Sequence, residues 1–420
     1  MKYYFFPIVH LRCSISLFYL LLYLVCGVHV YGQGDRIALF FPSDESPEMA
    51  RLCREVVSEF NAQSSIGTIE LVAKSGWEEV AFHFRTEVSN KHIAGILMAK
   101  HSHALDLYKQ TLIMPLEAFQ KQDPIFFGQF STKYMSTVYG ENGKLLGIPL
   151  FRTIPVLYYN IDKIMHSDCS ADLAAGKLPQ NWADFETLLV NIKNSTGKTP
   201  FLVCGDWYEW VFESMVMQCG GILSSSFDSV RFNSPESIAT LNYWKRLREM
   251  GLIDTANNWR ATMNSFKYQH YPIVSYSTGG IEAIKGNISF RYEVGMLPMN
   301  KVKAMSMSGS NLYFSSNMTP AQVRIATSFV KFAYEKKQIS QEIAERTGLL
   351  STTQQRAGTP PIDPKISKQL EFAKPNFVTY GYAKVRKILK EAIARAFSGQ
   401  QNAEQSLNRA QKEATSVLAN

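Results

Sequence analysis

Short apolar runs alternate with an amphipathic pattern between residues 36 and 98. The runs at 36–41, 68–73 and 93–98 are each typical of a buried strand. Residues 46–60 open with a Ser-Pro pair that suits a helix start, and then repeat apolar side chains at helical spacing, at Met49, Leu52, Cys53, Val56, Val57 and Phe60. A further helical segment lies between the second and third strands. This order predicts a largely parallel sheet with helices on both faces.

The middle of the chain contains segments that predict crossings between two lobes. Residues 147–160 have the pattern of a long strand interrupted by Pro149 and Pro155, which is too irregular for the centre of a sheet and suits a connection. A second crossing, rich in Gly and Ser, is expected at 308–316. Between the crossings the pattern predicts helices at 178–194 and 233–251 and strands at 271–280 and 292–298, and beyond them it predicts only helices.

These crossings divide the chain into two predicted lobes. We assign residues 33–150 and 271–310 to an N-terminal lobe, and residues 151–270 and 311–420 to a C-terminal lobe. The length of 420 residues agrees with this division, because one hydrophobic core seldom serves so long a chain. The expected fold class is therefore α/β, with two lobes joined by crossing strands.

Residues 1–32 have the pattern of a signal peptide, in which basic residues precede an apolar run at 15–28. Val30 and Gly32 are small enough for a cleavage site, which places the mature start near Gln33. A retained membrane anchor is the alternative, although the run is shorter than the ~20 residues that span a bilayer. We therefore expect an exported, periplasmic protein.

Composition and charge exclude some partners but do not identify the function. The chain is 46% apolar and 19% charged, which is ordinary for a globular protein. Its formal net charge of +8 falls to +6 without Lys2 and Arg12, and the excess is spread along the chain, so nucleic acid is not expected as a partner. A mildly basic surface is compatible with an anionic ligand.

Motifs for metal binding and catalysis are sparse. The cysteines beyond the leader have no CxxC spacing, and a Cys204–Cys219 disulfide is the alternative to two buried thiols. His101 and His103 lie two apart and a tyrosine pair stands at 158–159, but further ligands at metal spacing are missing. HExxH, P-loop and GxSxG motifs are absent, and no carboxylate pair stands out as acid and base. We expect no metal, no cofactor and no catalysis.

The stretch GDWYEWVFESM, residues 205–215, places two tryptophans three positions apart at a predicted helix start. Asp206 is expected to be the N-cap and Glu209 to complete a capping box, which puts Trp207 and Trp210 in the first turn, facing one way. Two indoles beside free N–H groups would form a flat apolar shelf suited to a polyol. Burial of both rings in the core is the alternative interpretation.

From residue 36 to 415 the chain resembles the extracellular solute-binding proteins of ABC importers, the group that includes maltose-binding proteins. The resemblance rests on GIPLFRTIPVLYYNIDKI, YEVGMLP, the W-x-D-F run at 182–185 and RTGLLS at 346–351. Within that group it is most similar to periplasmic proteins that bind sn-glycerol 3-phosphate, which share PVLYYN, G-x-W-x-x-W at 205–210 and S-[ST]-G at 277–279. The resemblance implies a two-lobed periplasmic-binding-protein fold of type II, with the ligand between the lobes.

The resemblance also implies a set of ligand-contacting residues, namely Trp77, His101, Thr153, Trp207, Trp210, Ser277, Gly309 and Arg386. Arg386 matches the family's arginine, and its planar guanidinium suits phosphate oxygens, whereas composition alone would make it a solvated charge. Ser277 and Gly309 match a hydroxyl and a glycine turn that can cradle phosphate.

Four positions depart from the family pattern. Trp77 stands where the family has tyrosine, and Thr153 where it has serine, and both keep a plausible contact with a ligand. His101 replaces a glutamate that accepts from ligand hydroxyls, and Leu349 replaces a tyrosine. Because two polar contacts differ, the exact ligand stays open.

The function that follows from the resemblance is that of the substrate-binding component of an ABC importer. The expected ligand is a small phosphorylated polyol, either sn-glycerol 3-phosphate or a glycerophosphodiester. Sugar or oligosaccharide binding by the same fold is the main alternative, followed by ferric-ion binding and a secreted hydrolase. The implied partners are the small ligand and a membrane permease, and we expect a monomer.

Overall fold

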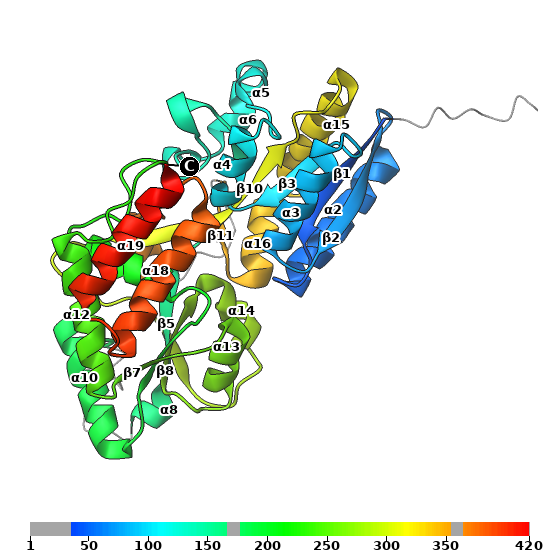
Figure 1. Ribbon diagram of the computed structural model, residues 1–420. Coiled ribbons are helices and arrows are strands. Elements are labelled where there is room, and N and C mark those ends of the chain that lie inside the picture. Colours follow the sequence, from blue (N-terminus) through cyan, green and yellow to red (C-terminus); the bar gives the residue numbers. More distant parts are fainter. Residues whose placement is uncertain (1–34, 166–176, 354–363, 420) are drawn as a thin grey trace, which may run out of the picture.

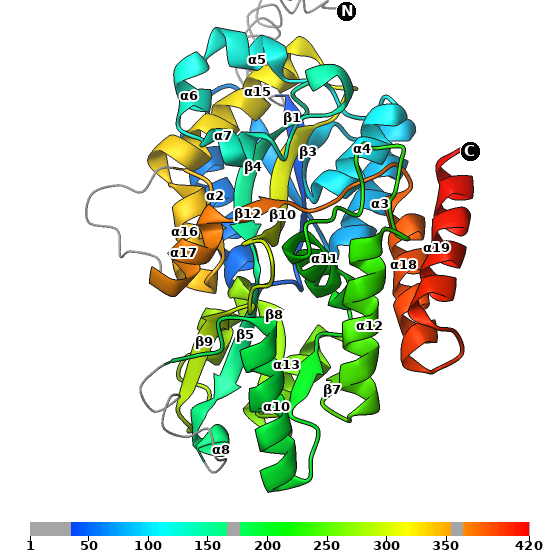
Figure 2. The same ribbon diagram turned by 90° about the vertical axis from the view of Figure 1, so that its left-hand side faces the viewer.

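The computed structural model describes residues 35–165, 177–353 and 364–419, and in this part of the chain the backbone forms two β-sheets. The first sheet contains β1 (Arg36–Pro42), β2 (Thr68–Lys74), β3 (Gly95–Ala99), β4 (Gly147–Thr153), β10 (Met305–Phe314), β11 (Leu350–Ser351) and β12 (Ala373–Pro375). The second contains β5 (Pro155–Asn160), β6 (Phe201–Val203), β7 (Ile253–Thr255), β8 (Ile273–Ser277) and β9 (Tyr292–Met296). We call the half built on the first sheet lobe 1 and the other half lobe 2 (Figures 1 and 2). The predicted leader and Cys169 lie outside the described residues.

Lobe 1 follows the predicted β-α-β-α-β order. The strand order is β2-β1-β3-β10-β4-β11, with β12 paired to β10, and β1 is parallel to both β2 and β3. Its helices are α2 (Pro47–Gln63), α3 (Trp77–Ser89), α4 (His101–Lys109), α5 (Glu117–Gln122), α6 (Pro124–Gly128), α7 (Thr132–Met135), the 3-10 turn η1 (Glu141–Gly143), α15 (Pro320–Lys331), the π-helical η3 (Phe332–Lys336) and α16 (Ile339–Thr347). The start of α2 is confirmed, because the Ser46 hydroxyl accepts from the Met49 N–H at 3.3 Å and Pro47 is the first helical residue.

Lobe 2 has the strand order β7-β6-β8-β5-β9. Its helices are α8 (Ile161–Ile164), α10 (Trp182–Thr196), α11 (Tyr208–Gln218), α12 (Pro235–Glu249), α13 (Trp259–Lys267), the 3-10 turn η2 (Thr278–Gly280), α14 (Ile281–Ile284), α18 (Tyr382–Phe397) and α19 (Ala403–Leu418). A further helix, α17 (Pro364–Glu371), lies next to β9. The C-terminal helices α18 and α19 pack beside α12, so the end of the chain belongs to lobe 2 (Figure 1).

Residues 147–160 connect the lobes as predicted. Contrary to the prediction, both of their strands lie inside a sheet. β4 lies between β11 and β10, and β5 lies between β8 and β9. Pro149 is accommodated because the pairing of β4 with β10 shifts register beside it, between Ser310 and Asn311. Pro155 is the first residue of β5, where a missing N–H is tolerated.

The strand pairing also differs from the predicted division into lobes. β8 and β9 belong to lobe 2, although residues 271–310 were assigned to the N-terminal lobe. Residues 320–347 form helices of lobe 1, although they were assigned to the C-terminal lobe. The reason is that β8 and β9 both pair with β5, so the chain returns to lobe 1 only at β10. The short β11 and β12 fall in a region where only helices were predicted.

The described cysteines are not cross-linked. Cys53, Cys204 and Cys219 are free thiols, so the alternative of a Cys204–Cys219 disulfide is not realised. Burial raises the pKa of the Cys204 thiol to about 12, which keeps it protonated. Within the described ranges no cluster of three or more His, Cys, Asp or Glu side chains is placed to hold a metal ion. None of the described helices is long and apolar enough to cross a membrane.

Candidate functional site: a cavity between the lobes

A cavity of about 560 Å³ lies between the two lobes. Its wall includes the beginnings of α2, α3 and α4 and the end of β4 from lobe 1, the middle of β10, and the beginnings of α11, α13 and α18 with the end of β8 from lobe 2. All eight residues that the sequence analysis expected at the ligand line this cavity: Trp77, His101, Thr153, Trp207, Trp210, Ser277, Gly309 and Arg386. The volume is in the range of small-molecule sites.

The capping box predicted at the start of α11 is wrong. Trp207 is the N-cap residue, and no side chain caps the helix there. The Asp206 carboxylate instead accepts from the Trp259 backbone N–H at 2.8 Å. Glu209 is 3% exposed and forms an ion pair with Arg386 on α18. Both side chains that the local pattern assigned to the helix cap are thus bound to partners far away in the chain.

The two tryptophans lie against the cavity, but they do not form a flat shelf. The ring centroids of Trp207 and Trp210 are 6.3 Å apart and their planes meet at 51°. Trp207 also packs on Tyr276, with centroids 5.0 Å apart. Trp210 is 9% exposed, and its indole N–H is buried without a hydrogen-bond partner among the described residues. The rings therefore form an apolar corner that contains one unpaired donor.

Arg386 is held against the start of α11 and is not a solvated charge. Its Nε donates to the Glu209 carboxylate and its Nη2 donates to the Asp206 carbonyl. Lys390 donates to the same carbonyl at 3.2 Å. Burial by itself would lower the pKa of Arg386, but Glu209 and Tyr382 outweigh it and raise that pKa above its usual range. The guanidinium is therefore permanently charged, and its charge is already paired.

His101 cannot take over the role of the glutamate that it replaces without losing a protein partner. Its Nε2 lies 3.0 Å from the Tyr139 carbonyl, which can only accept, so Nε2 carries the proton. Its Nδ1 then accepts from the Tyr313 hydroxyl at 3.2 Å. Burial lowers the pKa of His101 to about 4, so the ring is neutral near pH 7. Leu349 also lines the cavity and offers only apolar contact there.

The acidic groups on the lobe 1 rim of the cavity already have partners. Lys100 lies 5.7 Å from the ring centroid of Trp77, and the Trp77 side chain hydrogen-bonds to Glu45. Burial raises the pKa of Glu45, against the opposing effects of Lys100 and Trp77. Glu78 lies 2.9 Å from His103 Nε2. Burial acts to raise the pKa of Glu78, but the contact with His103 and the charge of Lys100 lower it to about 2.

Small polar residues line the cavity where the lobes meet. The Thr153 hydroxyl lies 3.1 Å from that of Thr278, which joins the end of β4 to η2. Ser277, at the end of β8, is 7% exposed. Gly309 cannot be replaced without a clash, since a Cβ built on it would lie 2.2 Å from the Phe151 carbonyl oxygen. A side chain at this position would push β10 away from β4.

The sequence analysis missed Arg152, which lines the cavity and is 1% exposed. Among the described residues its guanidinium donates to neutral oxygens, those of Phe151, Ser310, Tyr134, Thr137 and Asn311. A signal existed in the run GIPLFRT, where one arginine stands inside an otherwise apolar strand. Arginine is almost never fully buried unless it is paired, so this position required an explanation.

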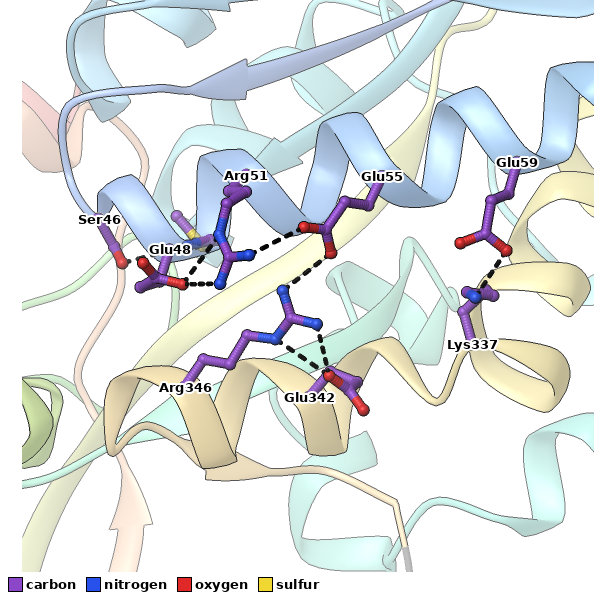
Figure 3. A network of polar contacts seen from close by, with 9 residues as sticks. Ser46, Glu48, Arg51, Glu55, Glu59, Lys337, Glu342 and Arg346 are labelled. Atoms are coloured by element: carbon purple, nitrogen blue, oxygen red, sulfur yellow. Dashed lines mark hydrogen bonds and ion pairs between the residues drawn. The ribbon is translucent and has the colours of Figure 1, made fainter.

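An ion-pair network fixes the two lobe 1 helices whose ends line the cavity (Figure 3). Arg346 on α16 contacts Glu55 on α2 at 2.9 Å and Glu342 on its own helix at 2.9 Å. Arg51 contacts Glu48 at 2.6 Å and Glu55 at 3.2 Å. The cavity is lined by residues from the start of α2 and from the end of α16, so the network holds these two ends in register.

The chain belongs to the family of bacterial extracellular solute-binding proteins, whose pattern matches residues 55–372. This confirms the resemblance found in the sequence. The sn-glycerol-3-phosphate-binding periplasmic protein UgpB of Escherichia coli strain K12 is 22% identical over 290 residues, which is 66% of this chain and 64% of that protein. The match therefore spans less than two thirds of the length of that relative.

Solved structures share the fold. UgpB from Mycobacterium tuberculosis in complex with glycerophosphocholine superimposes with a TM-score of 0.76 at 17% identity, covering 92% of this chain and 98% of that one. Maltose-bound MalE3 of T. maritima superimposes with a TM-score of 0.72 at 16% identity, covering 91% and 99%. The two-lobed, maltose-binding-protein-like fold is thus confirmed.

Proposed function

We propose that this chain is the substrate-binding component of an ABC importer and that it captures a small phosphorylated polyol between its lobes. The observation that carries the proposal is the interlobe cavity, whose lining combines tryptophan rings, hydroxyls and two arginines contributed by both lobes. Relatives described as binding sn-glycerol 3-phosphate and glycerophosphocholine support this ligand class. The ligand would be either sn-glycerol 3-phosphate or a glycerophosphodiester.

In this proposal the residues of the cavity have distinct roles. Trp77, Trp207 and Trp210 pack on the carbon skeleton, and the unpaired indole N–H of Trp210 donates to a ligand oxygen. Thr153 and Ser277 supply hydroxyls, and the backbone around Gly309 approaches the ligand closely. Arg386 contacts the ligand through Nη1, because its Nε and Nη2 are engaged by the protein. His101 contributes ring surface only.

Capture would proceed by closure of the lobes about the connecting strands. Ligand shifts such a hinge toward the closed form only in so far as it binds that form better. The closed protein would then be recognised by a membrane permease after export to the periplasm, where we expect a monomer. No bond is made or broken in this cycle.

Binding of a sugar or oligosaccharide is the second candidate. It is favoured by the tryptophan rings of the lining, because aromatic faces offer large apolar surfaces against which a sugar ring can pack. Maltose-bound MalE3, which has the same fold, shows that this architecture accommodates such ligands.

A thermal-shift screen separates the two candidates. The chain from residue 33 to 420 is tested with sn-glycerol 3-phosphate, glycerophosphocholine, maltose, inorganic phosphate and ferric citrate. A ligand present at a hundred times its dissociation constant adds ~2.7 kcal/mol of stability, which gives a clear shift. We expect a shift with the glycerophosphates. A shift with maltose alone would support sugar binding and would reject the proposal that the ligand is a phosphorylated polyol.

A further inference from the structure

Arg152 is a buried cation that has no acidic side chain as a partner among the described residues. Four of its five N–H groups are directed to neutral acceptors, with Nη1 donating to the Phe151 and Ser310 carbonyls at 2.7 and 3.0 Å. Nη2 donates to the Tyr134 carbonyl, to Asn311 Oδ1 at 2.8 Å and to the Thr137 hydroxyl. The Nε–H is buried and has no partner among the described residues. A guanidinium arranged in this way is well oriented but carries an uncompensated charge.

The surroundings of Arg152 leave its guanidinium charged. Burial lowers the pKa of Arg152 to about 10, and the groups that oppose this are the hydroxyls of Tyr313, Tyr334 and Tyr134. The group is therefore still protonated near pH 7. Its charge also acts on His101, whose pKa it helps to lower. Arg386 differs, because the Glu209 carboxylate directly contacts its guanidinium.

The position of Arg152 brings this charge to the cavity wall. Arg152 and its neighbours Thr153, Gly309 and Asn311 all line the cavity. Arg152 Nη1 lies 3.0 Å from the place that a Cβ of Gly309 would occupy, so the guanidinium lies directly against the backbone of β10. Because Arg152 is 1% exposed, its unit charge acts more strongly than it would in water.

We propose that Arg152 makes the lobe 1 wall of the cavity, formed by Thr153, Ser308 and Gly309, the anion-selective side of the site. The anionic group of the ligand lies against this wall, and Arg386 with Glu209 forms a neutral pair that contacts the uncharged part. This inference rests on the proposed binding of a phosphorylated polyol and adds the orientation of the ligand. In this arrangement the ligand supplies the negative charge that Arg152 lacks among the described residues.

Calorimetric titration with sn-glycerol 3-phosphate tests the proposal. The wild-type chain from residue 33 is compared with Arg152→Gln, with Arg152→Lys, and with the double variant Glu209→Gln/Arg386→Gln, which removes one charge of each sign. We expect Arg152→Gln to weaken binding at least about tenfold, Arg152→Lys to restore part of the loss, and the double variant to weaken binding less than Arg152→Gln does. Arg36→Gln removes an exposed guanidinium of the same lobe that is paired with Glu70 and lies outside the cavity, so it serves as the matched control and should bind as the wild type does.

A loss in the double variant that equals or exceeds that of Arg152→Gln would overturn the inference and leave the proposed function standing. A wild-type chain that binds maltose but no phosphate ester would reject the proposed function, and this inference with it. If Arg152→Gln does not fold, as judged by circular dichroism, a crystal structure of the wild type with sn-glycerol 3-phosphate decides the matter. Phosphorus nearer to the Arg152 guanidinium supports the proposal, and phosphorus nearer to that of Arg386 refutes it.

Discussion

The buried carboxyl of Glu213 lies where two segments that connect the lobes meet. Its Oε2 accepts from the Ser306 hydroxyl at 2.8 Å and its Oε1 accepts from the Phe377 N–H at 2.5 Å. Burial raises the pKa of Glu213 to about 8, in spite of these two hydrogen bonds and with a further contribution from Glu209. The side chain is 1% exposed, so the folded protein holds it in its neutral form near pH 7.

This titration predicts a loss of stability as the pH rises. Because the folded-state pKa of Glu213 lies above the ordinary value of 4.5, its contribution is fully present below about pH 4.5 and is lost as the pH rises through about 8. Glu213→Gln keeps the shape and cannot ionise. The free energy of unfolding of this variant, relative to the wild type, should therefore increase by at least ~1 kcal/mol between pH 5 and pH 8. Denaturant titrations at several pH values measure it, and parallel curves for the two proteins would contradict the assignment.

The Arg386–Glu209 pair predicts two separable effects of one substitution. Arg386→Ala leaves the 3% exposed Glu209 carboxylate without its cation, which should lower the free energy of unfolding by roughly 3 kcal/mol. The substitution should also weaken the binding of a phosphorylated ligand by ~2 kcal/mol or more, because an unpaired carboxylate then faces the cavity. Adding Glu209→Gln should recover part of both losses. Calorimetry and denaturant unfolding check this, and an unchanged affinity in Arg386→Ala would mean that the ligand does not reach this side.

At the scale of elements, the cavity depends on helix ends that distant helices hold in place. The start of α2 and the end of α16 both contribute lining residues, and their side chains are connected by the Arg346, Glu55 and Arg51 contacts (Figure 3). A shared network of several charges contributes more than isolated surface pairs do. The contacts therefore stabilise the geometry of the rim as well as the fold.

Arg346→Met should reduce stability measurably, whereas an isolated pair should not matter. Removing Arg346 breaks contacts to Glu55 and Glu342 at once, and we expect a loss of about 1 kcal/mol in the free energy of unfolding. The matched control is Arg36→Met, because the Arg36 guanidinium forms a single ion pair among the described residues, with Glu70 at 3.5 Å, and both side chains are well exposed. Its effect should be near zero. Equal effects of the two substitutions in urea titrations would show that the network adds nothing.

At the scale of the whole molecule, the lobes touch outside the connecting strands. The Asp106 carboxylate on α4 of lobe 1 accepts at 2.8 Å from the backbone N–H of Gly381, the residue before α18 of lobe 2. Tyr380 donates its backbone N–H to the Phe227 carbonyl, and Phe227 packs near His101. A carboxylate at a helix start is stabilising because free N–H groups and the helix dipole meet there. The helix that carries Arg386 is thus anchored to the opposite lobe.

Asp106→Ala should loosen this anchor. We expect the free energy of unfolding to fall by roughly 1–2 kcal/mol, and the radius of gyration of the ligand-free chain to increase in small-angle scattering. Asp184→Ala is the comparison, because Asp184 is an exposed residue of α10 within lobe 2. Scattering curves that coincide for the wild type and Asp106→Ala would show that the contact does not restrain the lobes.

The sequence by itself determined the elements whose signals are local. The Ser-Pro start of α2 and its apolar spacing predict the helix and its buried face, because capping and periodicity act within a few residues. The resemblance then placed eight residues that all line the cavity. Only the tertiary structure decided that Glu209 pairs with Arg386, that β8 belongs to lobe 2, and that Arg152 is buried among neutral oxygens. These outcomes depend on partners far away in the chain, and burial makes such contacts stronger than the local preferences that a single sequence displays.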